Sequence, residues 1–287
     1  MPFSLTREDL MKLYRRNALK TFFLFGISVG AFCPSWAQSE SVDPALQTLI
    51  DGSQRSEPNR VRDTFRHPAE VLTFFGVKPD SVVVEILPGA GGYWTEILGP
   101  YLKEEGRYIA ANGEKASTSV DVQKDNAALA AKLAADPADY GKVEVTEFAA
   151  DRHAIAPPGG ADFVLTFRNI HNWMAAGTTE QAFATFYKAL KPGGILGVEE
   201  HRGKSDVPQD PLAKSGYVRQ DVAVGFATAA GFKFVGSSEV NANPKDTKDY
   251  PAGVWTLPPT YKLGAQDHAK YEAIGESDRF ILKFQKP

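Results

Sequence analysis

The sequence predicts an α/β fold in which a mostly parallel sheet lies between two layers of helices, a Rossmann-like three-layer sandwich. Residues 81–87 and 161–167 are uninterrupted apolar runs, which are typical of strands covered on both faces. Helical segments alternate with such strands along the chain, the pattern that a parallel sheet requires. The 287 residues are 43% hydrophobic and 23% charged, a composition ordinary for a globular domain.

The remaining elements follow from periodicity and turn residues. Further strands are expected at residues 107–111, 143–148, 195–198, 232–235 and 279–284. Helices are expected at residues 43–52, 67–76, 93–102, 119–135, 178–190 and 219–230. No helix separates the last two strands, so we expect them to pair antiparallel at one edge. Insertions at 200–217 and 239–277 follow late strands, on the side where open α/β sheets bind ligands.

The N-terminus has the features of a secretory signal. Arg15 and Arg16 precede an apolar run at 21–33, and Ser35-Trp36-Ala37 offers a small-x-small cleavage site. We expect a signal peptide at 1–37, a helical extension at 38–67 and the main domain at 68–287. The arginine pair partly resembles a twin-arginine signal, which exports folded proteins. The protein is therefore expected to be periplasmic or secreted, with no stable membrane anchor after cleavage; a buried or membrane-anchoring N-terminal helix is the alternative.

Charge and cysteine content exclude several classes of function. The net charge is −3 and the pI about 6.0, so the chain lacks the basic character of a nucleic-acid binder. The single cysteine, Cys33, lies in the expected leader. The cleaved chain would therefore have no disulfide and no cysteine nucleophile. The sequence leaves the oligomeric state open.

The most informative segment runs from Glu85 to Gly91, between a predicted buried strand and a predicted helix. Glycines there let the backbone turn sharply and approach a ligand closely, and the helix N-terminus offers free N–H groups to an anion. A dinucleotide fingerprint would need a third glycine where Trp94 stands. The bulky indole argues against a nicotinamide cofactor.

The stretch Val84-Glu85-Ile86-x-Pro88-Gly89-x-Gly91 resembles motif I of the class I S-adenosylmethionine (SAM)-dependent methyltransferases. The element order is similar to that family, whose seven-stranded sheet has the order 3-2-1-4-5-7-6 with strand 7 antiparallel. A group of predicted methyltransferases, often carrying signal peptides, is the closer resemblance. Its matching stretches here are residues 66–70, 171–173, 190–194 and 277–280. The resemblance implies a SAM-dependent methyltransferase that acts on a small-molecule substrate.

The resemblance also implies a set of residues around SAM. Those expected to contact or organise the cofactor are Glu85, Pro88, Gly89, Gly91, Tyr93, Asn112, Asp151 and Arg168. Asn112 stands near the strand end where the family usually places an acid for the ribose hydroxyls. Asp151 stands near the place of an acid that often meets the adenine amino group.

Residues after the fourth and fifth strands should face the transferred methyl group. His171 is the first candidate for a base because its unperturbed pKa lies near neutrality. Asn172 is a candidate for orienting the substrate, and Glu199, or its neighbour Glu200, for holding a substrate amine or hydroxyl. Structural roles are the alternatives: a bonded loop histidine, a turn asparagine and a solvated acidic pair.

Two other functions stay open. The chain could be an exported, non-catalytic ligand-binding protein, because SAM is a cytoplasmic metabolite and strand 2 lacks the usual acid. It could also be a metal-dependent enzyme using His171, Glu199 and His201, although their spacing is not diagnostic. Two groups of residues are further candidates for walls of the site: Arg60, Arg62, Arg66 and His67, and the aromatic side chains Tyr250, Trp255 and Tyr261.

Overall fold

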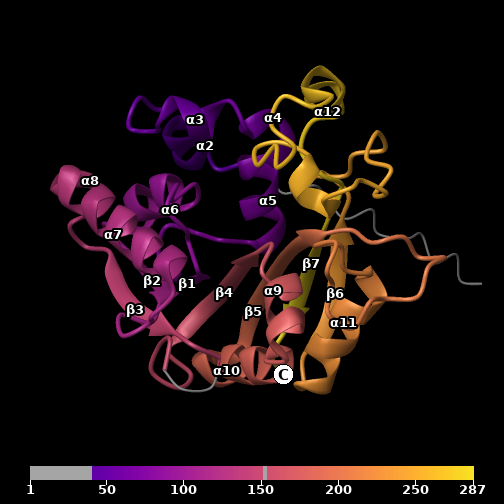
Figure 1. Cartoon of the computed structure of the whole chain (residues 1–287). Helices are drawn as coiled ribbons and strands as arrows, with labels where there is room; N and C mark the ends of the chain where they lie inside the picture. The colour runs from indigo at the N-terminus through magenta and orange to yellow at the C-terminus, as the bar shows by residue number, and fades with distance from the viewer. Residues whose placement is uncertain (1–40, 151–153) are drawn as a thin grey trace, which may run out of the picture. The chain divides into compact units, whose positions relative to one another are not determined.

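A computed structural model describes residues 41–150 and 154–287, which belong to one compact unit. The predicted signal peptide and Asp151 lie outside the described residues. Helices cover both faces of a central sheet (Figure 1). Within the described part of the chain, no helix is long and apolar enough to span a bilayer.

The sheet has the strand order β3-β2-β1-β4-β5-β7-β6, as expected. Its strands are β1 (Val82–Ile86), β2 (Arg107–Gly113), β3 (Glu144–Phe148), β4 (Ala161–Phe167), β5 (Leu190–His201), β6 (Lys233–Ser238) and β7 (Arg279–Gln285). The first five strands pair in parallel, whereas β7 is antiparallel to both β5 and β6. The carboxyl ends of β1, β4 and β5 therefore meet at one edge of the sheet.

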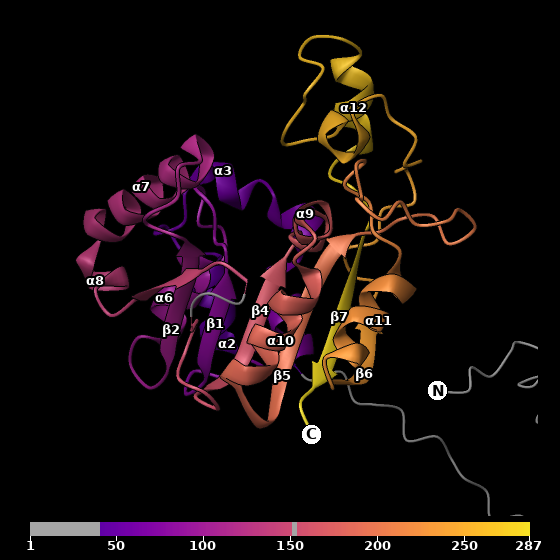
Figure 2. The ribbon, with the colours of Figure 1, turned by 60° about the horizontal axis from the view of Figure 1, so that its bottom comes forward.

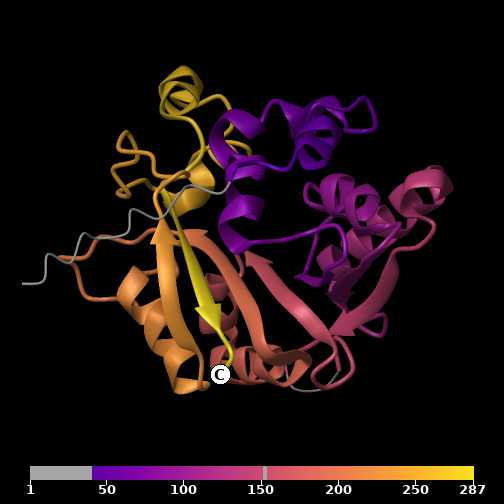
Figure 3. The ribbon, with the colours of Figure 1, turned by 180° about the vertical axis from the view of Figure 1, so that it is seen from behind.

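Each face of the sheet has its own apolar core. On one face lie α9 (Ile170–Ala176), α10 (Thr179–Ala189) and α11 (Gln220–Ala229), seen in front of the strands in Figure 2. On the other lie α2 (Pro44–Ile50), α5 (Pro68–Phe75), α6 (Thr95–Leu102) and α7 (Val120–Ala135), part of which Figure 3 shows from behind. Side chains of β1 alternate between the two cores, since Val83 faces one and Val84 the other.

The N-terminal extension joins the main domain along the carboxyl edge of the sheet. It includes α3 (Glu57–Arg60) and α4 (Asp63–Arg66), two short helices between the segments 43–52 and 67–76 that were expected to be helical. The long insertion before β7 contains a 3₁₀ turn at Gly253–Thr256 and α12 (His268–Ile274). Figures 1 and 3 show α4 beside the yellow insertion at the edge where β5 ends. The extension and the insertion, far apart in sequence, therefore meet above this edge.

Two further differences from the sequence prediction are local. The residues after β4, expected as a loop, form α9, and Pro137–Tyr140 form the short α8. Strand β5 is longer than expected at both ends, because Leu190 pairs with Ala161 of β4 and the pairing with β7 extends to His201.

Candidate functional site

The glycine loop after β1 is open to solvent on one side. Gly89 has a left-handed backbone (φ 70°), and a Cβ built on it would meet no atom within 4 Å. Ala90 and Gly91 are exposed. Asn59, from the extension, donates a hydrogen bond to the Gly91 carbonyl at 3.0 Å. At Gly89 the loop therefore presents bare backbone to an open space, as its glycines predicted, while the extension fixes its far end.

Glu85 lies in β1 just before this loop, and among the described residues its carboxylate accepts no hydrogen bond from the loop amides. Its buried carboxylate accepts a short hydrogen bond from the hydroxyl of Tyr108, which also bonds Thr95 at 2.8 Å. Burial raises the pKa of Glu85 to about 7, although the Tyr108 hydrogen bond and the Arg168 charge act against this. Glu85 is thus part of a buried polar network between β1 and β2.

Tyr93 faces the N-terminal extension. Its hydroxyl donates a hydrogen bond to Asp63, and its ring lies 4.6 Å from the guanidinium carbon of Arg66. The neighbouring Trp94 stacks on Phe167 with ring centroids 4.3 Å apart. Both aromatic side chains are buried. Tyr93 connects the glycine loop to the N-terminal extension, and Trp94 connects it to β4.

Asn112 ends β2 next to the glycine loop and is only 4% exposed. Its side-chain amide makes no hydrogen bond to any residue that the structure describes. An amide without a protein partner has donor and acceptor capacity available for a ligand. Pro88 is half-buried at the start of the loop.

Asn169 connects the ends of β4 and β1. Its side chain donates hydrogen bonds to the carbonyl of Ile86 and to the hydroxyl of Thr166, each at 3.2 Å. The preceding residue, Arg168, has a left-handed backbone (φ 61°), which is uncommon for a side chain of this size. Sequence reasoning did not select Asn169, although Asn is a residue often used where a strand passes into a helix.

Glu200 fixes His171. One carboxylate oxygen accepts from the His171 ring at Nδ1 (3.0 Å), and the other from its backbone amide (3.2 Å). The first oxygen also accepts from the His201 amide at 2.8 Å. Because a carboxylate accepts at Nδ1, the neutral ring carries its proton there and leaves Nε2 as a free base.

Glu199 points to the opposite face of β5 and does not join the two histidines. It lies 3.5 Å from both Arg168 and Arg279 and accepts a hydrogen bond from Asn241 at 2.7 Å. The group whose ligand atoms lie within 4.8 Å of one another is His171, Glu200 and His201. The acid that lies with the two histidines is therefore Glu200, and the expectation of Glu199 in a metal site with them was wrong.

His201 completes this cluster. Its Nδ1 lies 2.6 Å from the Ser277 hydroxyl, and its ring centroid is 5.5 Å from that of His171. Burial, together with His171 and nearby arginines, holds the pKa of His201 well below its usual range. His201 is consequently neutral at neutral pH.

A cavity of about 300 Å³ lies over the two histidines at the ends of β4 and β5. Its polar lining includes Asn172, and Trp255 from the insertion meets the His171 ring edge-on at 5.8 Å. Of the other aromatic candidates, Tyr250 packs on Tyr271, and Tyr261 stacks on His268. The glycine loop contributes no residue to this cavity, so loop and cavity are two neighbouring spaces at the ends of the adjacent strands β1 and β4.

Three arginines line the cavity: Arg62, Arg66 and Arg168. The first two each bond Glu276 through Nε, at 2.6 and 3.1 Å. Arg60 and His67, which were expected beside them, lie elsewhere. Arg60 pairs with Glu57 on the surface, and His67 bonds Asn241 at 2.9 Å.

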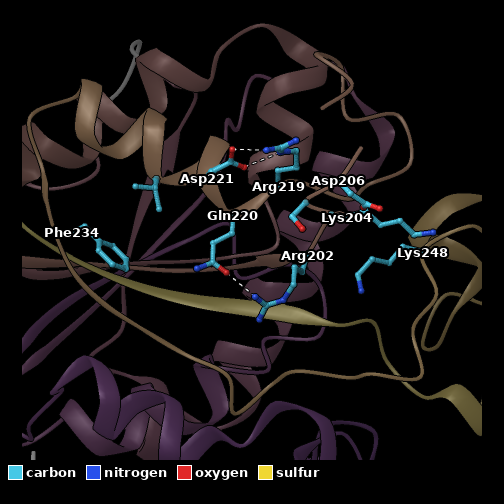
Figure 4. Close-up of a pocket in the computed structure, with 11 residues that line it drawn as sticks. Arg202, Lys204, Asp206, Arg219, Gln220, Asp221, Phe234 and Lys248 are labelled. Carbon is cyan, nitrogen blue, oxygen red and sulfur yellow. Dashed lines mark hydrogen bonds and ion pairs between the residues drawn. The ribbon is translucent and has the colours of Figure 1, made fainter. Parts of the chain in front are cut away.

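A larger depression, of about 870 Å³, lies beside β6 and α11 (Figure 4). Its two arginines are engaged by neighbouring side chains: Arg202 by Gln220 and by two carboxylates, and Arg219 by Asp221. No candidate residue of the sequence analysis lines it. It lies away from the ends of β1 and β4, so we regard the smaller cavity as the candidate site.

Comparison with known proteins agrees with the observed topology. No protein-family model and no curated protein matches the chain by sequence. The structure is similar to a SAM-dependent methyltransferase from Aquifex aeolicus, with a TM-score of 0.52 and 17% identity over 86% of this chain and 100% of that one.

It is also similar to the [4+2]-cyclase SpnF (TM-score 0.53, 16% identity, 84% of this chain and 92% of that one). A third similar structure is phosphoethanolamine N-methyltransferase 2 of Haemonchus contortus in complex with SAM (TM-score 0.51, 15% identity, 84% and 56%). At these identities the likeness establishes the class I methyltransferase fold, and the activity has to be argued from the site.

Proposed function

We propose that this protein binds SAM at the glycine loop and transfers its methyl group to a small molecule held in the cavity over His171. The observation that carries the proposal is the open space beside Gly89, whose backbone approaches that space with no side chain in the way. The methyltransferase topology supports it, since the order of the strands brings the loop and the cavity to one edge.

The residues around the loop fit SAM at two points. The bare backbone at Gly89 leaves room for the amino-acid part of the cofactor, and the unpaired amide of Asn112 is a partner for a ribose hydroxyl. When bound, SAM supplies a methyl group on a positively charged sulfur. Asp151 is proposed as an adenine contact from its sequence position alone.

The cavity residues would prepare the acceptor. His171 Nε2 is free to take the proton that an acceptor hydroxyl or amine loses as its methyl bond forms. Glu200 holds the imidazole in that tautomer and orientation. Asn172 is exposed in the cavity lining and can orient the acceptor, while Glu199 acts through Arg168 rather than by direct contact.

We further propose that residues 1–37 direct the chain out of the cytoplasm and are then removed. The basic pair, the apolar run and the small residues around Trp36 support this. Export creates a constraint on the activity, because the cofactor is made in the cytoplasm. A folded, SAM-loaded export route would satisfy that constraint.

A non-catalytic ligand-binding protein on the same fold is the second candidate. It is favoured by the absence of an acid at the end of β2, where Asn112 and Gly113 stand. A metal-dependent enzyme is less well supported, because both oxygens of Glu200 already accept hydrogen bonds from His171 and His201.

Calorimetric titration of residues 38–287 with SAM tests the proposal. We expect micromolar binding by the wild type and at least tenfold weaker binding by Gly89→Ala, because the new methyl group would occupy the ligand's space. Gly159→Ala is the matched control. Gly159 has nearly the same φ (68°) and equally empty surroundings but precedes β4, at the opposite edge of the sheet.

Both alanine variants carry a similar backbone strain of about 1–2 kcal/mol, so comparison between them isolates the effect on binding. Gly91→Val provides a second variant without that strain, because Gly91 does not have a positive φ. Its Cβ would lie 3.7 Å from the nearest atom, Asn59 Oδ1, which is an ordinary contact distance. Absence of SAM binding by the wild type would overturn the methyltransferase proposal in favour of the binding protein.

A further inference from the structure

The cavity over the histidines is unusual in its charge. Three guanidinium groups line it, from Arg62, Arg66 and Arg168, against one carboxylate, that of Glu276. Behind them lie Arg279 and the carboxylates of Glu199 and Glu200. These four arginines and three glutamates give four positive charges against three negative ones, and the neutral His201 adds no charge.

Hydrogen bonding leaves the three lining arginines incompletely satisfied. Arg62 and Arg66 each use only Nε, toward Glu276, and Arg168 uses only Nη1, toward Glu199. The other two nitrogens of each guanidinium bond to no residue in the described part of the chain. Arg66 is 2% exposed, so nearly all of its side chain is buried.

Donors of this kind select a particular ligand. A guanidinium presents its N–H groups in a planar fork that matches the oxygens of a carboxylate or phosphate. A cation, by contrast, would be repelled by three arginines and would find Glu200 and Glu276 already engaged. The depression of Figure 4 differs, because its arginines are more fully bonded. All three nitrogens of Arg202 donate to side chains, and Arg219 binds the Asp221 carboxylate through two nitrogens.

We infer that the cavity binds an anionic small molecule, carrying a carboxylate or phosphate group, through Arg62, Arg66 and Arg168. This inference rests on the proposed function in one respect, because it makes that anion the methyl acceptor. The same molecule would present its nucleophilic oxygen or nitrogen to His171 Nε2, which lines the same cavity. On reaction, the acceptor forms a bond to the methyl carbon, the carbon–sulfur bond of SAM breaks, and the acceptor proton passes to His171.

Titration with inorganic phosphate, and separately with acetate at equal ionic strength, tests the anion site. We expect phosphate to bind the wild type and to raise its melting temperature. Arg62→Gln should weaken binding about tenfold or more, because one charge-assisted pair of donors is lost. Comparison of phosphate with acetate shows which anion the site prefers.

Arg60→Gln is the matched control: it removes the same charge from the neighbouring surface helix, where Arg60 pairs only with Glu57. Asn172→Asp covers the case in which Arg62→Gln fails to fold, because Asn172 is exposed in the cavity and the added carboxylate should also weaken phosphate binding. Equal phosphate affinity in wild type, Arg62→Gln and Asn172→Asp would overturn the inference.

The two proposals fail separately. SAM binding should be unchanged in Arg62→Gln, because Arg62 does not border the glycine loop. A protein that binds SAM but neither anion would retain the proposed function and lose the anion site. A protein that binds phosphate through Arg62 but not SAM would retain the anion site and lose the methyl transfer.

Discussion

Two buried carboxylates near the edge of the sheet differ in their surroundings. Glu200 accepts two backbone N–H groups and an imidazole, whereas Glu85 has one neutral hydroxyl donor, from Tyr108. Hydrogen bonds from N–H groups stabilise a carboxylate, and burial without enough of them favours the protonated acid. Residue type alone therefore does not assign a role to an acid at this edge.

Glu85 should make stability depend on pH. Its pKa is raised from the usual value near 4.5 to about 7 in the folded protein, so the unfolded chain loses the proton first. The contribution of Glu85 to stability is therefore fully present below pH 4.5 and is lost as the pH rises through 7, by about 3 kcal/mol in all. Glu85→Gln, which keeps an acceptor for Tyr108, should remove this fall and be more stable than wild type at pH 8.

Urea unfolding at pH 5 and pH 8 measures this effect. Glu144→Gln is the control, because Glu144 forms an exposed pair with Arg107. A Glu85→Gln variant whose stability differed from wild type by the same amount at both pH values would contradict the expectation.

At the scale of elements, the alternation of side chains along β5 decides which acid meets the histidine. Leu196 and Val198 pack in the core shared with α9, so Glu200, two residues further, faces the same side. Glu199 necessarily faces the other side. The alternation along β5 can be read from the sequence. It indicates which acid faces His171 only if α9 is known to begin at Ile170, and that helix was not predicted.

The strands and the glycine loop were predictable because apolar runs and turn residues are local signals, whereas the strand order was expected only from the resemblance to a known family. The cavity was not, because it depends on contacts between α4 and the insertion before β7. Arg62 and Arg66 reach Glu276 across more than 200 residues. No periodicity indicates such a pairing, so the arginines were recognised only as a basic cluster.

The insertion is held in place through Asp246. This buried carboxylate accepts hydrogen bonds from the Tyr217 hydroxyl and from the amides of Lys248 and Asp278. Asp246→Ala should leave these donors without a partner and reduce stability by about 2 kcal/mol or more. Amide hydrogen exchange should accelerate at residues 250–262, which wall the cavity, more than in β1 or β4.

Asp249→Ala is the comparison variant, since Asp249 is exposed and accepts only from its neighbour Thr247. Faster exchange in that variant, or uniform acceleration across the sheet in Asp246→Ala, would show that Asp246 is not a specific support of the cavity wall.

At the scale of the whole molecule, two cores enclose one sheet, and the extension and the insertion close over its functional edge. Asn59 reaches the glycine loop and Arg62 the cavity, so a single short segment of the extension contacts both spaces. The folded state that has this arrangement is also the state that would have to carry SAM out of the cytoplasm.

Replacing Arg15 and Arg16 by lysine tests how the molecule leaves the cell. The double variant keeps the positive charge that any secretory signal needs but loses the arginine pair that the folded-protein route reads. Expressed in a Gram-negative host, the wild type should yield a periplasmic protein whose intact mass matches a chain that begins at Gln38. The variant should stay in the cytoplasm. Export of the lysine variant would mean that the chain crosses unfolded and meets no SAM outside, which favours the binding protein. Full-length wild type found only in the cytoplasm would refute export and leave the enzyme beside its cofactor.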